Sequence, residues 1–173
     1  LDNGANTLLC MPSLNQQFFA TKLVSVVPGN AAQNLPVTNG VMLLNDTATG
    51  LPLALMNASK LTALRTGAVG AVGIKHLTPS DSSSIGIIGC GVQGMHQAIF
   101  ACHVRPIRVI YCLKRNEESF QNLEAFVHQF FPYVSIIPCE SAEILLANTN
   151  IIIAATTSAV PVLPNDPNLL EGK

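Results

Sequence analysis

Three glycines spaced G-x-G-x-x-G are the residues of this chain whose types and spacing point most directly to chemistry. An apolar run, 85–88, leads into Gly89, Gly91 and Gly94, and an amphipathic run at helical spacing follows. Gly89 permits a tight turn, Gly91 lets the backbone approach a pyrophosphate, and Gly94 lets a helix pack close to a sheet. The helix N-terminus then offers N–H groups to phosphates. The pattern predicts a dinucleotide site; the alternative is a glycine-rich turn without a ligand.

The kind of dinucleotide depends on the end of the second strand. An acidic residue about 20 positions past the glycines would bind the ribose of NAD, but residues 111–116 contain no carboxylate. Lys114 and Arg115 stand there instead and could bind a 2′-phosphate. We therefore expect NADP, with NAD as the alternative. The competing interpretation makes these two cations solvated surface charges.

The elements around the glycine loop alternate between strand and helix. After the first strand and helix, strands are expected at 107–113, 134–137 and 151–155, and helices at 117–131 and 141–147. Nearly continuous apolar strands in this order predict an α/β fold, a Rossmann-type parallel sheet covered on both faces. Thr156 follows the fourth strand, where open α/β sheets bind ligands. It is a further cofactor-binding candidate, although an ordinary polar loop would look the same.

The N-terminal third reads differently, as a β-rich segment. Strands are expected at 22–27, 40–44 and 51–56, the last two as a hairpin, followed by a helix over 59–76 with Ser59 as its N-cap. Glycines every three residues in that helix, at 67, 70 and 73, indicate a close neighbour, most simply a sheet. The expected domains are a partial β-rich dimerisation and substrate domain (1–58), a connecting helix and linker (59–82) and a partial dinucleotide-binding domain (83–173).

Composition narrows the class of protein. Over 173 residues the net charge is −1, so the composition shows no excess of positive charge that would indicate nucleic-acid binding. No apolar run reaches the roughly 18 residues of a membrane span. Only 11% of residues are charged, so we expect part of the surface to be covered by missing segments or by a second subunit. The chain starts at Leu1, which suggests an excerpt of a longer protein.

Cysteine and histidine usage adds two expectations. Five cysteines without a C-x-x-C pair, in apolar settings, indicate reduced thiols in a cytoplasmic protein. Four histidines stand at no metal-ligand spacing, so no metal is expected.

Three segments carry a resemblance to a known family. The strand Lys22-Leu-Val-Ser-Val-Val-Pro-Gly-Asn, the hairpin 44–55 and the run Leu61-Thr-Ala-Leu-Arg-Thr-Gly-Ala precede the glycine loop. With them the chain resembles the ornithine cyclodeaminase/mu-crystallin family over nearly its whole length. The resemblance implies a homodimer formed through the N-terminal domain and an active site between that domain and the Rossmann domain.

The resemblance also implies roles for single residues. Lys22 and Arg65 match the basic residues that hold the α-carboxylate of a small amino-acid-like substrate. Thr38 falls near a position that contacts the nicotinamide end. Val92 and Gln93 supply backbone contacts to the pyrophosphate.

Two departures from the family pattern bear on chemistry. The acid/base aspartate of the family is expected beyond Lys173, so no catalytic residue lies within this chain, and an N-terminal carboxylate-binding arginine is absent too. Cys112 stands where NAD-using members have an aspartate. The resemblance implies hydride transfer at the α-carbon of an amino or imino acid, by a cyclodeaminase, an amino-acid dehydrogenase or a ketimine reductase. The alternative is a crystallin-like protein that binds NADP(H) and a small ligand without turnover.

Overall fold

The computed structural model describes residues 1–173, with the side chain of Asp2 excepted. The chain forms two compact units, 1–62 and 63–173. Among the helices of the described residues, none has both the length and the apolar character needed to cross a membrane.

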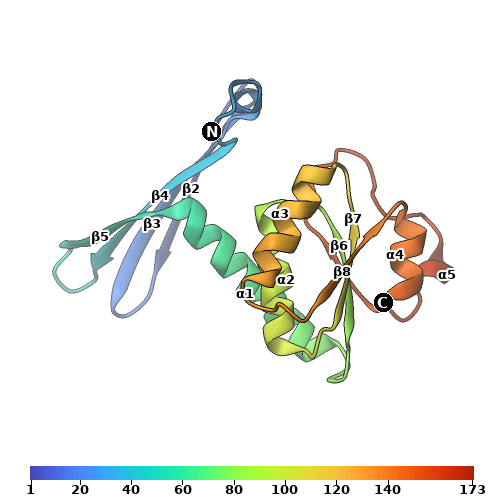
Figure 1. The fold of residues 1–173 in the computed structure, drawn as a ribbon. Coiled ribbons are helices and arrows are strands. Elements are labelled where there is room, and N and C mark those ends of the chain that lie inside the picture. The colour runs from blue at the N-terminus through green and yellow to red at the C-terminus, as the bar shows by residue number, and fades with distance from the viewer. The chain divides into compact units, whose positions relative to one another are not determined.

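The first unit is an antiparallel sheet of five strands in chain order (Figure 1). The strands are β1 (Asp2–Asn3), β2 (Asn6–Leu14), β3 (Phe18–Val26), β4 (Thr38–Asp46) and β5 (Pro52–Asn57), and the 3-10 helix η1 (Pro28–Gln33) joins β3 to β4. The predicted hairpin is confirmed as β4 and β5. Its turn is closed by Asp46, whose Oδ1 accepts from both the backbone N–H and the hydroxyl of Thr49 at 2.7 Å.

The two faces of this sheet have different surroundings. Leu23 and Val41 are direct partners across β3 and β4, as are Leu43 and Leu55 across β4 and β5. Directly opposed residues point to one face. Most large apolar side chains of this outer face are exposed, namely Leu8, Leu14, Leu23, Val41, Leu43 and Leu55, whereas Phe19 is half-buried.

The inner face lies against the start of helix α1 (Ala58–Leu77). Ala58 is fully buried, and Lys22 on β3 donates from Nζ to the hydroxyl of Thr62 at 3.4 Å. The helix begins one residue earlier than expected. Its cap is Asn57, whose Oδ1 accepts from the N–H groups of Ser59 and Lys60 at 3.0 and 3.2 Å. The prediction of Ser59 as N-cap is therefore wrong.

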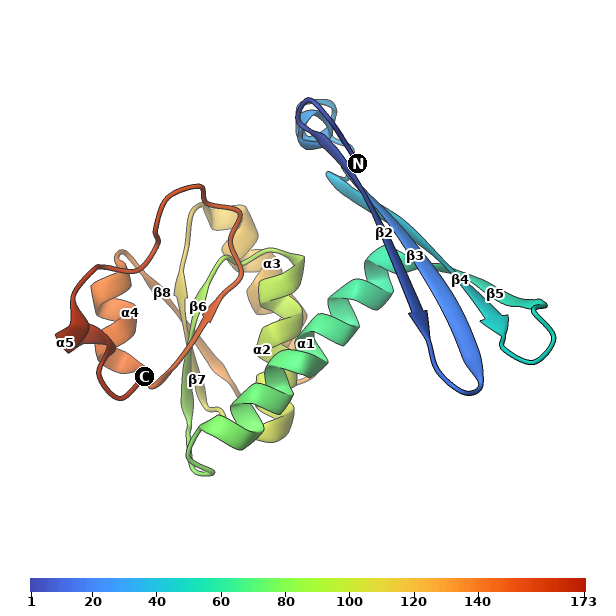
Figure 2. The same cartoon turned by 180° about the vertical axis from the view of Figure 1, so that it is seen from behind.

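The second unit is the α/β part of the chain. Its strands are β6 (Ser84–Ile88), β7 (Val109–Leu113), β8 (Ser135–Cys139) and β9 (Ile151–Ala154), all parallel in the order β8-β7-β6-β9. Helices α2 (Val92–Val104) and α3 (Glu117–His128) cover one face, and α4 (Ala142–Asn148) and α5 (Pro167–Leu170) lie on the other (Figures 1 and 2). The predicted Rossmann-type fold class is confirmed.

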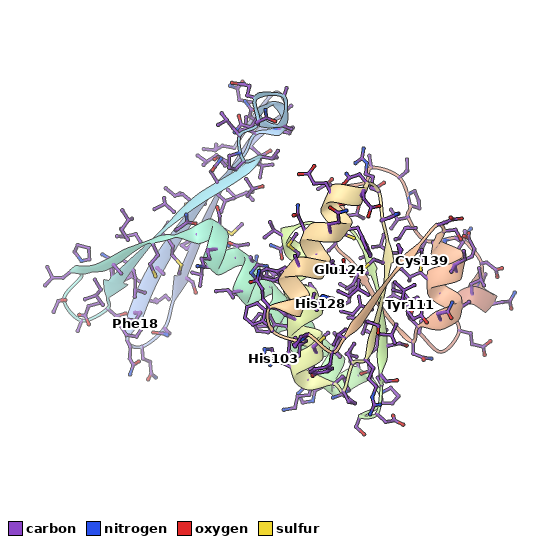
Figure 3. The ribbon with its side chains drawn as sticks, in the orientation of Figure 1. Phe18, His103, Tyr111, Glu124, His128 and Cys139 are labelled. Atoms are coloured by element: carbon purple, nitrogen blue, oxygen red, sulfur yellow. The ribbon has the colours of Figure 1, made fainter. Side chains whose placement is uncertain are left out.

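Element ends differ from the expected ones near prolines and aromatics. Helix α3 stops at His128 rather than residue 131, and β8 includes Pro138, which the sequence placed outside the strand. An edge strand tolerates proline because one side of it donates no ladder bonds. His128 donates from Nε2 to the Val134 carbonyl at 2.9 Å, and His103 packs edge-on against Phe131 (Figure 3). Both histidines therefore have structural contacts.

The glycine stripe of α1 packs against a helix, not against the sheet as expected. A Cβ on Gly67 would stand 3.0 Å from the His96 carbonyl oxygen, and one on Gly70 would meet the side chain of Gln97. Gln97 also donates from Nε2 to the Thr66 carbonyl at 3.2 Å. Backbones of α1 and α2 approach closely because these positions lack side chains.

Arg105, just after α2, closes the far end of α1. Its Nη2 donates to the carbonyls of Ile74, Lys75 and Thr78 at 3.1, 2.6 and 2.8 Å, and its Nε donates to the Thr78 hydroxyl at 3.1 Å. The carbonyls of Ile74 and Lys75 belong to the last turn of the helix, and Thr78 directly follows it and also donates to the Ile74 carbonyl. One guanidinium therefore joins the C-terminal end of α1 to the residue that follows α2.

Candidate functional site

A cleft of about 670 Å³ opens at the carboxyl ends of β6, β7 and β9 in the second unit. It is lined by three loops, those that follow the three strands: 88–91, 113–116 and 155–159, together with Ser119 and Val162. The glycine loop, the second-strand end and Thr156 were each predicted from the sequence to contact the cofactor, and the fold brings them to one cleft. Ligands of open α/β sheets bind at this edge.

Gly89 and Gly94 of the loop lack a side chain for different structural reasons. Gly89 has φ +104°, and a Cβ there would be pressed against the Ala155 carbonyl. A Cβ on Gly94 would meet the Gly89 carbonyl oxygen. The fold itself therefore requires glycine at both positions.

Gly91 is different, because the fold gives no reason for its missing side chain. Its φ of −78° suits any residue, and no atom of the described residues lies within 4 Å of where its Cβ would be. Gly91 also lines the cleft and is the N-cap of α2. The space above it is therefore what a ligand approaching the backbone would use.

The residues around this space fit a dinucleotide. The first N–H groups of α2 have no partners within the helix, and the N-cap carries no side chain to accept from them. Two buried side-chain oxygens of the second unit, Gln93 Oε1 and Thr66 Oγ1, have no hydrogen-bond partner among the described residues. Neither of these two residues is among those that line the cleft. N–H groups at a helix N-terminus suit an anionic ligand.

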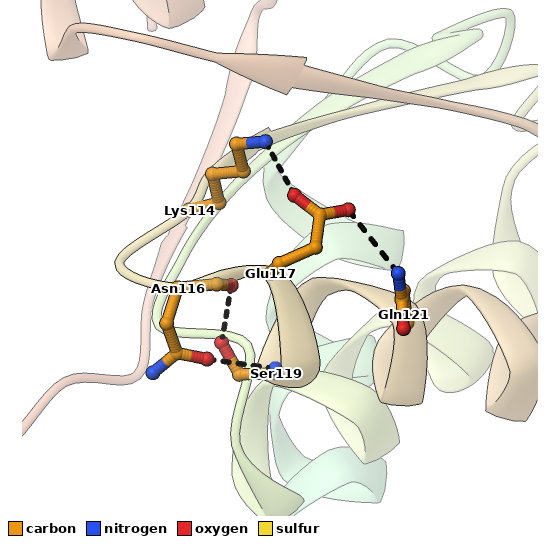
Figure 4. Close-up of polar contacts among 5 residues, drawn as sticks. All are labelled: Lys114, Asn116, Glu117, Ser119 and Gln121. Carbon is orange, nitrogen blue, oxygen red and sulfur yellow. Dashed lines mark hydrogen bonds and ion pairs between the residues drawn. The ribbon is translucent and has the colours of Figure 1, made fainter.

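The end of β7 carries an ion pair that the sequence did not reveal (Figure 4). Lys114 Nζ lies 2.7 Å from Glu117 Oε2, and Gln121 donates to the other carboxylate oxygen at 3.5 Å. The hydrogen bond from Lys114 holds the pKa of Glu117 below its usual value. Asn116 caps α3 by accepting from the Ser119 N–H at 2.8 Å.

This pair changes how the two predicted cations compare. Lys114 lines the cleft but already faces Glu117, and its Nζ also lies 5.8 Å from the centre of the Phe120 ring. Arg115 lines the cleft too and is exposed. An incoming phosphate would therefore meet Arg115 directly but would share Lys114 with a carboxylate.

Cys112 does not reach the cleft. It is fully buried in β7, whereas the cleft is lined by Leu113 and its successors. Cys112 instead donates toward Cys90 in the glycine loop. That hydrogen bond lowers the pKa of the Cys90 thiol and raises the pKa of the Cys112 thiol.

The remaining predicted residues lie as follows. Thr156 lines the cleft, and its hydroxyl accepts from the Ser158 N–H at 3.1 Å. Val92 is exposed in the first turn of α2. Thr38 is exposed at the start of β4 in the first unit, and Arg65 is exposed on α1.

Three cleft residues, Cys90, Asn116 and Ser119, were not predicted to face a ligand. Asn116 could have been recognised, since an Asn before two acidic residues is a strong N-cap signal and an N-cap after a parallel strand lies at the ligand-binding edge. The described side chains contain no group of three His, Cys, Asp or Glu residues placed to hold a metal ion.

Comparison with known proteins connects this geometry to one family. The model of the ornithine cyclodeaminase/mu-crystallin family matches residues 2–168. The Delta(1)-pyrroline-2-carboxylate reductase of Bacillus thuringiensis subsp. konkukian is 34% identical over 92% of the chain and 50% of its own length. The chain spans about half the length of the curated relatives it matches.

Two solved structures are similar along nearly the whole chain. The Thermococcus litoralis Delta(1)-pyrroline-2-carboxylate reductase, in complex with NADH and L-proline, has a TM-score of 0.78 and 32% identity, covering 92% of this chain and 55% of its own. An archaeal alanine dehydrogenase dimer with bound NAD has a TM-score of 0.85 and 30% identity, covering 94% and 50%.

Proposed function

Because the chain belongs to the ornithine cyclodeaminase/mu-crystallin family, we propose that the full-length protein uses NAD(P) to transfer hydride at the α-carbon of a small amino or imino acid. One observation carries the proposal: the cleft at the glycine loop, where Gly91 leaves room for a pyrophosphate that the fold alone does not need. Supporting it, the relatives include reductases of a cyclic imino acid, and one solved structure holds NADH and L-proline.

The residues of the chain would have two roles: some would bind the cofactor and others would bind the substrate. The nicotinamide supplies or accepts the hydride. The glycine loop and the α2 N-terminus hold the pyrophosphate through backbone N–H groups and so orient the cofactor. Thr156, Val92, Gln93 and Thr38 are proposed as further cofactor contacts. Each of these contacts would restrict the bound cofactor to fewer orientations. The rate of hydride transfer would rise because the distance between the nicotinamide and the substrate α-carbon is held constant.

Lys22 and Arg65 would bind the substrate carboxylate. Lys22 donates from Nζ to the Thr62 hydroxyl, and Arg65 is exposed on α1. A guanidinium can pair with a carboxylate through two parallel hydrogen bonds. The catalytic aspartate is proposed to lie outside this chain.

We propose NADP as the preferred cofactor. Support comes from Arg115, an exposed cation that lines the cleft. Lys114 also lines the cleft, but it is paired with Glu117 and would support the preference less. A 2′-phosphate would compete with the Glu117 carboxylate for Lys114. Glu117→Gln should therefore tighten NADPH binding about two- to fivefold, as expected for one surface charge, and leave NADH unchanged. Fluorescence titration measures both; a wild-type protein that prefers NADH would refute the preference.

The outer face of the first unit is proposed as a homodimer interface. Its exposed leucines and valine form a contiguous apolar face on paired strands, and such faces usually mark interfaces. The similar alanine dehydrogenase is a dimer. Leu43→Glu should give a monomer in sedimentation, whereas Val69→Glu, at an exposed site on α1, should not. A monomeric wild-type protein at micromolar concentration would contradict the proposal.

A cytoplasmic location is proposed as well. Of the cysteines in the described chain, Cys90, Cys102, Cys112 and Cys139 are buried free thiols and Cys10 is an exposed one. Free thiols persist where the compartment is reducing.

A substrate screen on the full-length protein tests the proposed function. Absorbance of the reduced cofactor is followed with cyclic imino acids, with α-keto acids plus ammonia, and with amino acids in the oxidative direction. We expect turnover with at least one class. Cofactor binding without turnover on any of them would favour the binding-protein alternative.

A further inference from the structure

Two buried cysteines of the second unit meet beside the cleft. Cys112 lies on β7 as the direct partner of Ile87 on β6, and Cys90 follows Ile87 by three residues. Gly89, with φ +104°, makes the turn between Ile87 and Cys90. Neighbouring strands are about 4.8 Å apart, and the thiols of Cys90 and Cys112 share a hydrogen bond. Both side chains belong to one buried cluster, which also contains Ile87.

Two other buried cysteines are placed differently. Cys139 on β8 is the direct partner of Leu113, and successive residues of a strand point to opposite faces, so Cys139 lies on the face opposite to Cys112. It belongs to a separate buried cluster. Cys102 on α2 lies in the same cluster as Cys112, but burial raises the pKa of its thiol to about 12, which keeps it protonated. Cys90 and Cys112 are therefore the pair that the fold brings together.

The two thiols of this pair differ in access and in reactivity. Cys90 is 5% exposed and lines the cleft, whereas Cys112 is fully buried. The hydrogen bond from Cys112 lowers the pKa of the Cys90 thiol and outweighs the opposing effect of burial. The same hydrogen bond raises the pKa of Cys112. Cys90 is thus the readier thiolate, the form that reacts with peroxides, and Cys112 is a thiol held next to it.

We infer that Cys90 and Cys112 form a reversible disulfide, with a peroxide as the oxidant, and that this disulfide lowers the affinity of the cleft for its dinucleotide. The second half of the inference rests on the proposed function. In a reducing compartment such a disulfide is transient, as in proteins that sense oxidants.

The chemistry has two steps. The Cys90 thiolate attacks one oxygen of hydrogen peroxide and the O–O bond breaks, which gives a sulfenic acid and a hydroxide that takes up the proton lost by Cys90. The Cys112 sulfur then attacks the Cys90 sulfur. The S–S bond forms, the S–O bond breaks, and water leaves with the Cys112 proton. Two thiols and one peroxide thus become one disulfide and two waters, and a thiol reductant reverses the result.

The disulfide would move the backbone that holds the pyrophosphate. Bonded sulfurs are about 2.05 Å apart, closer than any hydrogen-bonded pair of atoms. Cys112 is held in β7 by a strand on each side, β6 and β8. The shift therefore falls on the glycine loop, where Cys90 directly precedes Gly91, the N-cap of α2. The first N–H groups of α2 would move with it, away from the pyrophosphate.

Peptide mapping of the full-length protein tests the disulfide without any activity assay. Trypsin cleaves after lysine and arginine but not before proline, so Cys112 falls in peptide 109–114 and Cys90 in peptide 76–108. We expect hydrogen peroxide to join these two peptides and dithiothreitol to separate them, as seen by mass spectrometry. Exposed Cys10 is the internal measure of how far oxidation has gone.

A matched pair of variants assigns the sulfurs, because Cys102 shares peptide 76–108 with Cys90. Cys112→Ala should abolish the joined peptides and leave Cys90 as a sulfenic acid that dimedone traps. Cys102→Ala, which removes a thiol from the same buried cluster, should leave the joined peptides unchanged. Thermal unfolding checks that both variants fold, and the wild-type map stands without either.

Fluorescence titration then measures the effect on the cofactor. NADPH should bind the oxidised wild type at least tenfold more weakly, the loss expected when one hydrogen bond to a charged group is displaced. Dithiothreitol should restore the affinity to within twofold.

The outcomes separate this inference from the proposed function. No joined peptides at a dose of peroxide that oxidises Cys10 completely, joining through Cys102, or an oxidised protein that keeps its NADPH affinity within twofold would each overturn the inference. A reduced protein that binds neither NADPH nor NADH would instead overturn the proposed function, and the peptide map would still decide whether the disulfide forms.

Discussion

Replacing Gly91 by valine separates a requirement of the ligand from a requirement of the fold. The backbone at Gly91 has φ −78° and ψ −172°, which valine adopts readily, and the Cβ would meet no atom of the described residues within 4 Å. Losing glycine freedom in the unfolded chain should stabilise the protein by about 0.4–1 kcal/mol. Losing a favourable helix N-cap residue should cost a similar amount, about 0.5–1 kcal/mol. The free energy of unfolding should therefore change by less than about 1 kcal/mol.

The effect on cofactor binding should be much larger. Two methyl groups would fill the space through which a pyrophosphate approaches the α2 N-terminus. A hydrogen bond to a charged group contributes about 1.5–3 kcal/mol, so losing one phosphate contact weakens binding roughly 10- to 150-fold. Gly73→Val, on α1 where a Cβ also has open space, is the matched control and should leave cofactor affinity unchanged.

The assay combines fluorescence titration of NADPH with urea unfolding of the full-length protein. A contrasting variant, Gly94→Ala, should lower stability, because its Cβ would meet the Gly89 carbonyl oxygen. If folded Gly91→Val kept its affinity within twofold of the wild type, the pyrophosphate site would be misplaced.

Three further predictions address single side chains. Arg65→Lys keeps the charge but loses the two-pronged pairing; the catalytic efficiency should fall at least about tenfold with little change in cofactor affinity, and unchanged kinetics would make Arg65 structural. Cys90 lines the cleft and has a lowered pKa, so bound NADPH should slow its alkylation while exposed Cys10 reacts at the same rate; equal slowing of both, seen by mass spectrometry, would argue against the site. Arg105→Ala removes four hydrogen bonds to the end of α1 and should cost about 2 kcal/mol of stability, measured in urea with Arg105→Lys as the partial rescue; a loss under 0.5 kcal/mol would contradict the assigned role.

The Rossmann half could be predicted from the sequence because its signals are local. An apolar run, the three glycines and a helical stripe occupy about twenty consecutive residues. Each of these segments limits the structures that the following segment can adopt. The structure adds what local signals omit: Gly89 and Gly94 are required by backbone contacts, whereas Gly91 is not.

Strands containing proline were harder to place. Pro12 lies within β2 and Pro138 within β8. The sequence did not indicate β2, and it predicted a strand at 134–137 that stops before Pro138, since proline usually ends a strand. Both strands lie toward a sheet edge, where β1 is only two residues long and β8 has a single neighbour. Edge position is a property of the whole topology and cannot be derived from neighbouring residues.

The partners of individual side chains were also not predictable from the sequence. Asn57 and Ser59 are both good N-cap residues, and the choice between them depends on β5, whose pairing with β4 continues to Asn57. Lys114 was predicted as a free phosphate-binding cation, yet the α3 N-terminus brings Glu117 to it. In both cases two chemically reasonable partners exist in the sequence, and the backbone path decides between them.

Isotope transfer tests the central claim most directly. The full-length protein is incubated with NADPH carrying deuterium on the transferable C4 position and with a five-membered cyclic imino acid. We expect one deuterium on the α-carbon of the L-proline formed, detected by mass spectrometry and NMR. Product without deuterium at that carbon, or no product from any amino or imino acid partner, would contradict it.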